Sequence, residues 1–141
     1  MPDRFPPDEP VSPEHKGRIL VIDDEAEIRE SLETLLELEG YSVELGPNAT
    51  EGLRKAEAGN YDLILLDLMM PDVSGIEVCQ HVRADRRLKE ILVIVFTAAE
   101  MKEEELTAAG ADRFITKPYS LEGLRRVVRT LIKESAGSRA K

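Results

Sequence analysis

Short apolar runs alternate with amphipathic segments along most of this chain. The runs at 19–22, 63–66 and 91–96 are almost continuously apolar, as strands buried on both faces of a sheet are. The segments between them repeat apolar residues at spacings of three and four, which is typical of helices. Five strands alternating with five helices predict an α/β domain with a doubly wound parallel sheet, because parallel strands need crossover helices.

Turn and capping residues divide the chain into these elements. Asn48 with Glu51, and Ser74 with Glu77, have capping-box spacing and mark two helix starts. The predicted strands are 18–23, 41–45, 61–67, 91–97 and 113–116. The predicted helices are 25–39, 48–59, 74 to at least 82, 100–109 and 120–134. The residues expected to face inward on the third and fifth helices are Ile76, Cys79 and Val82, and Leu121, Leu124, Val128 and Leu131.

The two ends of the chain differ from this pattern. Residues 1–17 hold five of the eight prolines and have almost no apolar periodicity, so we predict a disordered proline-rich arm. Residues 135–141 are expected to form a flexible tail. The predicted domain is therefore 18–134, a usual size for one domain with a single core.

Composition excludes several classes of function. The net charge of −9 disfavours direct nucleic-acid binding, which needs a basic surface. No apolar run is long enough to cross a membrane, and the N-terminus lacks the apolar core of a secretory signal. The single cysteine, Cys79, excludes an internal disulfide and is expected to be a small buried helix residue. These features predict a cytoplasmic protein without membrane insertion.

Polar residues interrupt the apolar pattern where the predicted strands end. Asp23 and Asp24 end the first strand, Asp67 the third and Thr97 the fourth, and Lys117 follows the fifth. The carboxyl ends of parallel strands lie at one sheet edge, where open α/β sheets bind ligands. Neighbouring strands are about 4.8 Å apart, so these side chains would reach one small ligand if strands one, three, four and five are adjacent.

Each of these residues also has a simpler local interpretation. The aspartate pair could cap a helix, and Asp67 could be a turn residue. Thr97 could be an ordinary strand residue and Lys117 a solvated lysine. Their joint occurrence at four strand ends favours a common site.

Four segments in order resemble the receiver domain of bacterial two-component response regulators, a chemotaxis-regulator-like, flavodoxin-like fold. They are VIDDE, LLDLMMPDVSGIEV, VFTAAE and GADRFITKPY, and the resemblance covers about residues 17–134. It implies the strand order 2-1-3-4-5, which makes the strands adjacent as assumed above.

The carboxylate cluster is expected to bind Mg²⁺. Two unit charges 4 Å apart repel by roughly 4 kcal/mol at an effective dielectric constant of 20, and a divalent cation offsets this repulsion. Hard carboxylate oxygens suit magnesium. By resemblance, Asp24 and Asp67 bind the metal directly, Asp23 acts largely through a water, and the Met69 carbonyl is a further ligand.

The resemblance also implies a signalling role for the site. Asp67 would accept a phosphoryl group from a histidine kinase or a histidine phosphotransfer protein, and Thr97 and Lys117 would bind the phosphoryl oxygens. Pro118 would form a cis bond that orients the lysine. Thr97 and Phe114 would switch the surface of the fourth helix, fifth strand and fifth helix toward an unknown downstream protein. Such a domain is a phosphoacceptor rather than an enzyme, with slow self-dephosphorylation.

The sequence is compatible with more than one kind of protein. The chain is expected to be a stand-alone receiver, or else a receiver fragment of a longer regulator. A pseudo-receiver that binds partners without phosphate is disfavoured by the complete residue set. A haloacid-dehalogenase-type phosphohydrolase is disfavoured because the first strand ends in adjacent aspartates and not in a DxD pattern. Gly123 replaces the acidic residue usual in the receivers that dimerise through the fifth helix, so a monomer or a weak phosphorylation-dependent dimer is expected.

Overall fold

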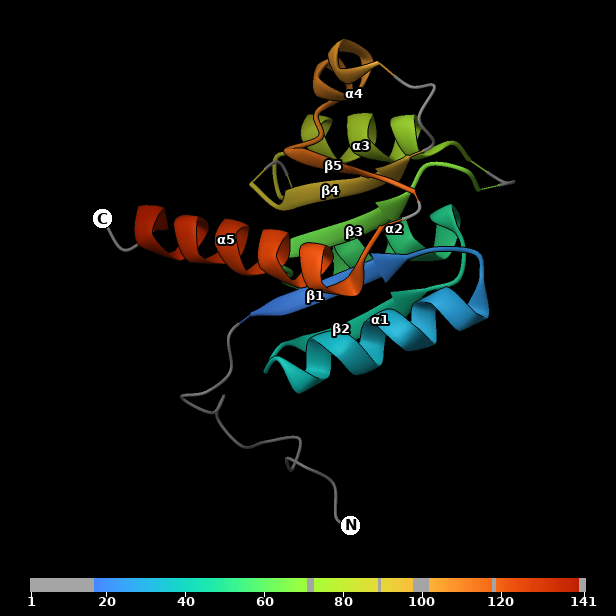
Figure 1. Cartoon of the computed structure of the whole chain (residues 1–141). Helices are drawn as coiled ribbons and strands as arrows, with labels where there is room; N and C mark the ends of the chain where they lie inside the picture. Colours follow the sequence, from blue (N-terminus) through green and yellow to red (C-terminus); the bar gives the residue numbers. More distant parts are fainter. Residues whose placement is uncertain (1–16, 71–72, 89, 98–101, 118, 140–141) are drawn as a thin grey trace.

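The protein folds around a five-stranded parallel sheet with the strand order β2-β1-β3-β4-β5 (Figure 1). The computed structural model describes residues 17–70, 73–88, 90–97, 102–117 and 119–139. The strands are β1 (Arg18–Ile22), β2 (Ser42–Gly46), β3 (Leu63–Asp67), β4 (Leu92–Thr97) and β5 (Arg113–Thr116). The helices are α1 (Ala26–Leu38), α2 (Ala49–Ala58), α3 (Gly75–Ala84), α4 (Glu103–Ala109) and α5 (Leu121–Arg139). The predicted fold class and strand order are confirmed.

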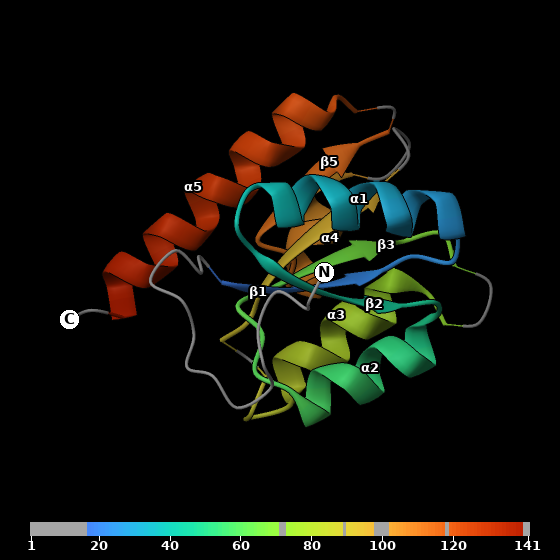
Figure 2. The ribbon, with the colours of Figure 1, turned by 90° about the horizontal axis from the view of Figure 1, so that it is seen from below.

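Helices cover both faces of the sheet. Figure 2 shows α1 and α5 on one face and α2 and α3 on the other. Helix α4 lies on the α2–α3 side, because its buried residues Leu106 and Ala109 belong to the core there. The sheet is thus the middle layer of a three-layer sandwich, because the crossover helices of a doubly wound sheet pack on both of its faces.

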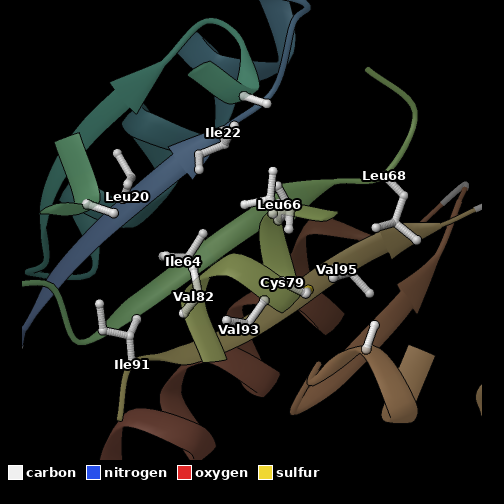
Figure 3. Packing of buried hydrophobic residues seen from close by; sticks show 14 of the residues in the cluster. Leu20, Ile22, Ile64, Leu66, Leu68, Cys79, Val82, Ile91, Val93 and Val95 are labelled. Carbon is white, nitrogen blue, oxygen red and sulfur yellow. The ribbon is translucent and has the colours of Figure 1, made fainter. Parts of the chain in front are cut away.

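Each face of the sheet has its own apolar core. In β1, Ile19 and Val21 face the α1–α5 core, whereas Leu20 and Ile22 face the α2–α3–α4 core. Figure 3 shows the second core, in which Cys79 lies among aliphatic side chains from β1, β3 and β4. Burial raises the pKa of the Cys79 thiol to about 11, so it stays protonated and serves as a packing residue, as predicted.

Local capping explains where several helices begin and end. The Asn48 carboxamide accepts a hydrogen bond from the Glu51 backbone N–H at 2.8 Å. Ser74 and Glu77 form the predicted reciprocal capping box at the start of α3. Helix α4 ends at Gly110, whose φ of 109° lies in the left-handed region that favours glycine.

Some sequence-based expectations about elements and burial were wrong. Helix α5 continues to Arg139, beyond the predicted end at 134, so part of the predicted tail is helical. Leu121 was expected to face inward but is 49 % exposed, because it lies at the first position of α5, outside the α1–α5 core. Ile76 is only partly buried, and Val78 is fully buried in its place.

The ends of the domain are only partly described. The arm 1–17 lies outside the described residues except for Gly17. That glycine is buried, and its carbonyl accepts a hydrogen bond from the Ser42 backbone N–H at 2.9 Å. The folded domain therefore includes Gly17, one position before the predicted boundary.

Candidate functional site

Three carboxylates meet at the carboxyl edge of the sheet. Asp67 is the last residue of β3, and Asp23 and Asp24 follow β1, the strand beside it. One carboxylate oxygen from each residue lies within 4.8 Å of the others. Asp23 and Asp67 are buried and Asp24 is exposed, so the cluster opens to solvent on the Asp24 side.

Lys117 contacts this cluster from the end of β5. Its ammonium donates to Asp67 Oδ1 at 3.3 Å, and the Met69 backbone N–H donates to the same oxygen at 3.0 Å. The Lys117 backbone N–H donates to the Thr97 carbonyl at 2.8 Å, which joins the ends of β4 and β5. The structure therefore brings together residues 50 positions apart in the chain.

Asp23 has the least favourable electrostatic position in the cluster. Its Oδ1 accepts a hydrogen bond from the Glu25 backbone N–H at 2.9 Å, but its buried Oδ2 has no partner among the described residues. Burial raises the pKa of Asp23 to about 6; the Glu25 bond opposes this shift, and the neighbouring Asp67 adds to it. An unpartnered buried carboxylate oxygen beside two other carboxylates fits a divalent cation, for which hard oxygen ligands are suited. Within the described residues, this donor set fits the expected Mg²⁺.

Thr97 and Met69, two further predicted site residues, lie close to the cluster in the fold. Thr97 is buried at the end of β4, next to Phe96, which is the register partner of Asp67. The Met69 side chain is 67 % exposed. Pro118, the predicted cis-proline, lies outside the described residues.

Phe114 is placed as a core residue behind the site. Its register partner is Val95, and it packs, partly buried, against the α2–α3–α4 core. Since side chains alternate along a strand, Thr97 points to the same sheet face as Val95 and therefore as Phe114.

Tyr119 is a residue near the site that sequence reasoning missed. Its ring stacks on Phe96 with a centroid distance of 4.9 Å and an interplanar angle of 15°. Burial raises the pKa of Tyr119, and the carboxylates of Asp23 and Asp67 raise it further. The sequence signal was its place at the end of the segment GADRFITKPY, two positions after the site lysine, which gave no indication of a contact with Phe96.

The burial of Asp23 predicts how the metal-free protein responds to pH. A carboxyl whose pKa is raised to about 6 in the folded state, above the usual aspartate value of about 4, binds its proton more tightly in the folded state than in the unfolded state. Its contribution therefore lowers the free energy of unfolding as the pH rises from about 4 to about 6, by at most about 3 kcal/mol. Asp23→Asn removes this titration, so in EDTA it should be more stable than wild type at pH 7 but not at pH 4.

Urea unfolding at both pH values, followed by circular dichroism, measures this difference. Asp24→Asn is the matched control, because Asp24 is exposed and belongs to the same cluster. An Asp23→Asn effect of equal size at both pH values would show that the carboxyl is not destabilised by burial.

A doubly wound sheet with a carboxylate cluster and a lysine at its carboxyl edge is the arrangement of the response-regulator receiver class. The sequence profile of the response regulator receiver domain matches residues 19–129. The chain therefore belongs to this family and is the receiver domain of a two-component response regulator.

Individual relatives agree with this assignment. The transcriptional regulatory protein ResD of Bacillus subtilis is 42 % identical over 106 residues, which cover 75 % of this chain and 44 % of that protein. A CheY-like receiver domain protein from Methanospirillum hungatei superposes with a TM-score of 0.79 and 32 % identity, covering 86 % of this chain and 97 % of that one. TrrA from Thermotoga maritima, solved in complex with Mg²⁺-BeF, superposes with a TM-score of 0.73 and 38 % identity, covering 81 % and 97 %.

The chain spans about half the length of the curated relatives it matches. Within the part of the chain that the structure describes, no helix is both long enough and apolar enough to cross a membrane.

Proposed function

We propose that this receiver accepts a phosphoryl group on Asp67 from a histidine kinase or a histidine phosphotransfer protein. The observation that carries the proposal is the position of Asp67, which is buried at the strand edge between two other carboxylates and the Lys117 ammonium. A carboxylate in this position can act as a nucleophile toward an anionic phosphoryl group only if its surroundings supply positive charge.

The hydrogen bonds of Asp67 suggest which oxygen attacks. Within the described residues, both side-chain hydrogen bonds of Asp67 end on Oδ1, from Met69 N–H and Lys117 Nζ. We therefore assign the attack to Oδ2. A P–O bond forms at Oδ2 while the P–N bond of the phosphohistidine breaks, and the leaving imidazole takes up a proton.

Asp24 and Asp67 would hold Mg²⁺ directly, Asp23 largely through a water, and the Met69 carbonyl as a further ligand. The donor set and the unpartnered Asp23 Oδ2 support this assignment, as does the Mg²⁺ in the structure of the related TrrA. When bound, the ion would supply the positive charge that lets one anion approach another.

Thr97 and Lys117 would stabilise the phosphoryl group. The Lys117 ammonium already contacts Asp67, and the Thr97 backbone is bonded to the Lys117 backbone. Phosphoryl transfer needs hydrogen-bond donors that are already positioned around the negatively charged phosphoryl oxygens, and a hydroxyl and an ammonium can serve as such donors. The product is an acyl phosphate, which water hydrolyses, so we propose slow self-dephosphorylation without any other enzymatic activity.

Phosphorylation would be transmitted to the surface of α4, β5 and α5. Helix α4 buries only Leu106 and Ala109 among its described residues, and its first three residues are all exposed glutamates. Arg83 holds the end of this helix, since its Nε donates to the Gly110 carbonyl at 2.8 Å. A short helix anchored at one end can move its other end at low cost.

If Phe114 transmits phosphorylation to the surface of α4, β5 and α5, Phe114→Ala should leave phosphorylation of Asp67 intact but weaken the structural change that follows it. Phe114 packs in the α2–α3–α4 core and not among the carboxylates, so the variant should take up phosphate at a near-normal rate. It should lose most of the change in hydrogen exchange over residues 98–118 that beryllofluoride with Mg²⁺ causes in wild type. Ile115→Ala is the matched control, because Ile115 packs on the other face of the same strand and should keep the response.

If Phe114→Ala responds to beryllofluoride like wild type, Phe114 is only a packing residue.

We propose a cytoplasmic location and action through protein contacts, as a monomer or a weak phosphorylation-dependent dimer. The free, buried Cys79 is consistent with a reducing compartment. The net charge of −9 supports protein partners rather than direct nucleic-acid binding by this domain. A receiver joined to an output domain is an equally compatible setting, because the matched relatives are about twice as long.

The experiment that tests the function is incubation of the protein with acetyl phosphate and Mg²⁺, followed by intact-mass analysis. The expected result is the addition of one phosphate. A chain that stays unmodified under these conditions, and also with a histidine-phosphorylated donor protein, would be a pseudo-receiver.

A further inference from the structure

The Tyr119 ring lies on the residue that stands beside the proposed phosphoacceptor. Phe96, on which the ring stacks, is 1 % exposed and is the register partner of Asp67. The Leu68 backbone N–H donates to the Phe96 carbonyl at 3.2 Å, so the chain stays paired with β4 just past Asp67. Phe96 is therefore held in place by the sheet, and an offset aromatic stack of the Tyr119 ring on it is a favourable contact.

The ring also lies on the sheet face that carries the cluster. Leu65 of β3 and Ile115 of β5 both pack in the α1–α5 core, as Phe96 does. Since side chains alternate, Asp67 and Lys117, two positions further along, follow on that face. The influence of the Asp23 and Asp67 carboxylates on the pKa of Tyr119 agrees with this location.

Lys117 needs such support because, among the described residues, Asp67 is the single hydrogen-bond partner of its ammonium. Its side chain is 33 % exposed and holds Asp67 through one contact of 3.3 Å. A lysine side chain loses considerable rotamer freedom when it is held in one position. Tyr119 follows only two residues later, so a fixed ring restrains the backbone from which the lysine extends.

We propose that Tyr119 is a positioning residue: its ring, stacked on Phe96, restrains the chain near Lys117 so that the Lys117 ammonium stays on Asp67. An effect of Tyr119 on the rate of phosphorylation rests on the proposed phosphoacceptor function of Asp67. An effect of Tyr119 on the position of the Lys117 side chain does not.

A purely structural role for Tyr119 is the main alternative. Tyr119 precedes Ser120, whose Oγ accepts a hydrogen bond from the Gly123 backbone N–H at 2.9 Å, as a helix cap does. Tyr119 and Leu124 then have the spacing of a hydrophobic staple, and both belong to the α1–α5 core. A staple alone would affect the stability of α5 without a specific effect at the lysine.

The first test measures the lysine without any phosphate. An amine-acylating reagent at low dose, read by peptide mass spectrometry, should label Lys117 more slowly than the exposed Lys102 and Lys133 in wild type. Tyr119→Ala should raise the labelling rate of Lys117 by about 2- to 10-fold, the range expected for loss of one aromatic pair, and leave the two exposed lysines unchanged. Tyr119→Phe keeps the stack and should match wild type. Tyr119→Leu keeps apolar bulk and should behave like Tyr119→Ala, which provides a second variant if the alanine form is unstable.

The second test is a double-mutant cycle on the rate of phosphorylation by acetyl phosphate. Tyr119→Ala should slow wild type by about 2- to 10-fold, whereas the same change in a Lys117→Ala background should alter the rate by less than about 2-fold, because the residue through which it acts is gone.

Three results would overturn the inference: unchanged Lys117 labelling in Tyr119→Ala, an equal slowing in both backgrounds, or a Tyr119→Phe variant as impaired as Tyr119→Ala. If wild type takes up no phosphate, the proposed function fails, and the labelling result still decides whether the ring positions the lysine.

Discussion

Asp67→Asn should abolish phosphate uptake from acetyl phosphate. The amide is neutral and a poor nucleophile, so no acyl phosphate can form at this position. The fold should be retained, because asparagine has nearly the same shape and its carbonyl oxygen can still accept the hydrogen bond from the Met69 N–H. Intact-mass analysis after incubation with Mg²⁺ and acetyl phosphate should show one phosphate on wild type and none on the variant.

Asp85→Asn is the matched control for this loss. It removes the same charge at the C-terminal end of α3, where Asp85 pairs with Arg87. It should be phosphorylated like wild type. Phosphate retained on Asp67→Asn would show that another residue is the acceptor, and peptide mapping would identify it.

Removal of Mg²⁺ should have the second-largest effect. With EDTA present, phosphorylation should slow by about 100-fold or more, because the phosphoryl donor must then approach three carboxylates whose charge the Lys117 ammonium offsets only in part. Added Mg²⁺ should also stabilise the folded protein, by about 2.7 kcal/mol when its concentration is 100 times the dissociation constant. Thermal unfolding with and without the ion measures this second effect.

Asp24→Ala tests whether the ion binds at the cluster. Asp24 is exposed, so its loss should not disturb the core, but it removes one of the three carboxylates of the proposed Mg²⁺ site. The melting temperature of this variant should respond little to Mg²⁺, whereas Glu134→Gln, which changes an exposed carboxylate of α5 outside this cluster, should respond like wild type. Equal responses in wild type and Asp24→Ala would place the ion elsewhere or exclude it.

The order of elements and the chemistry at the strand ends could be predicted from the sequence. Continuous apolar runs and capping residues are local features, and they correctly predicted the five strands and five helices of the described residues and the capping box of Ser74 before α3. Parallel strands have one carboxyl edge, so Asp23, Asp67 and Lys117 were expected together once the strands were taken as adjacent. The strand order itself came from the family resemblance, because periodicity does not say which strands are neighbours.

Local signals were weakest at element ends. Leu121 has the spacing of an inward-facing residue, but a helical position is buried only where another layer covers it, and the first turn of α5 is not covered there. The end of α5 was also predicted too early, since small and polar residues weaken the helical pattern without stopping the helix.

Only the tertiary structure decided the environment of each side chain. The unpartnered Asp23 Oδ2, the contact of Lys117 with Asp67 and the Tyr119–Phe96 stack join residues from different strands and loops. These contacts depend on strand register and on which face each side chain occupies, and both arise from the packing of the whole sheet. The sequence thus determined which chemical groups this protein carries at the carboxyl edge of its sheet. The tertiary structure decided which of these groups are buried and which contact one another, because burial and pairing depend on residues that are distant in the chain.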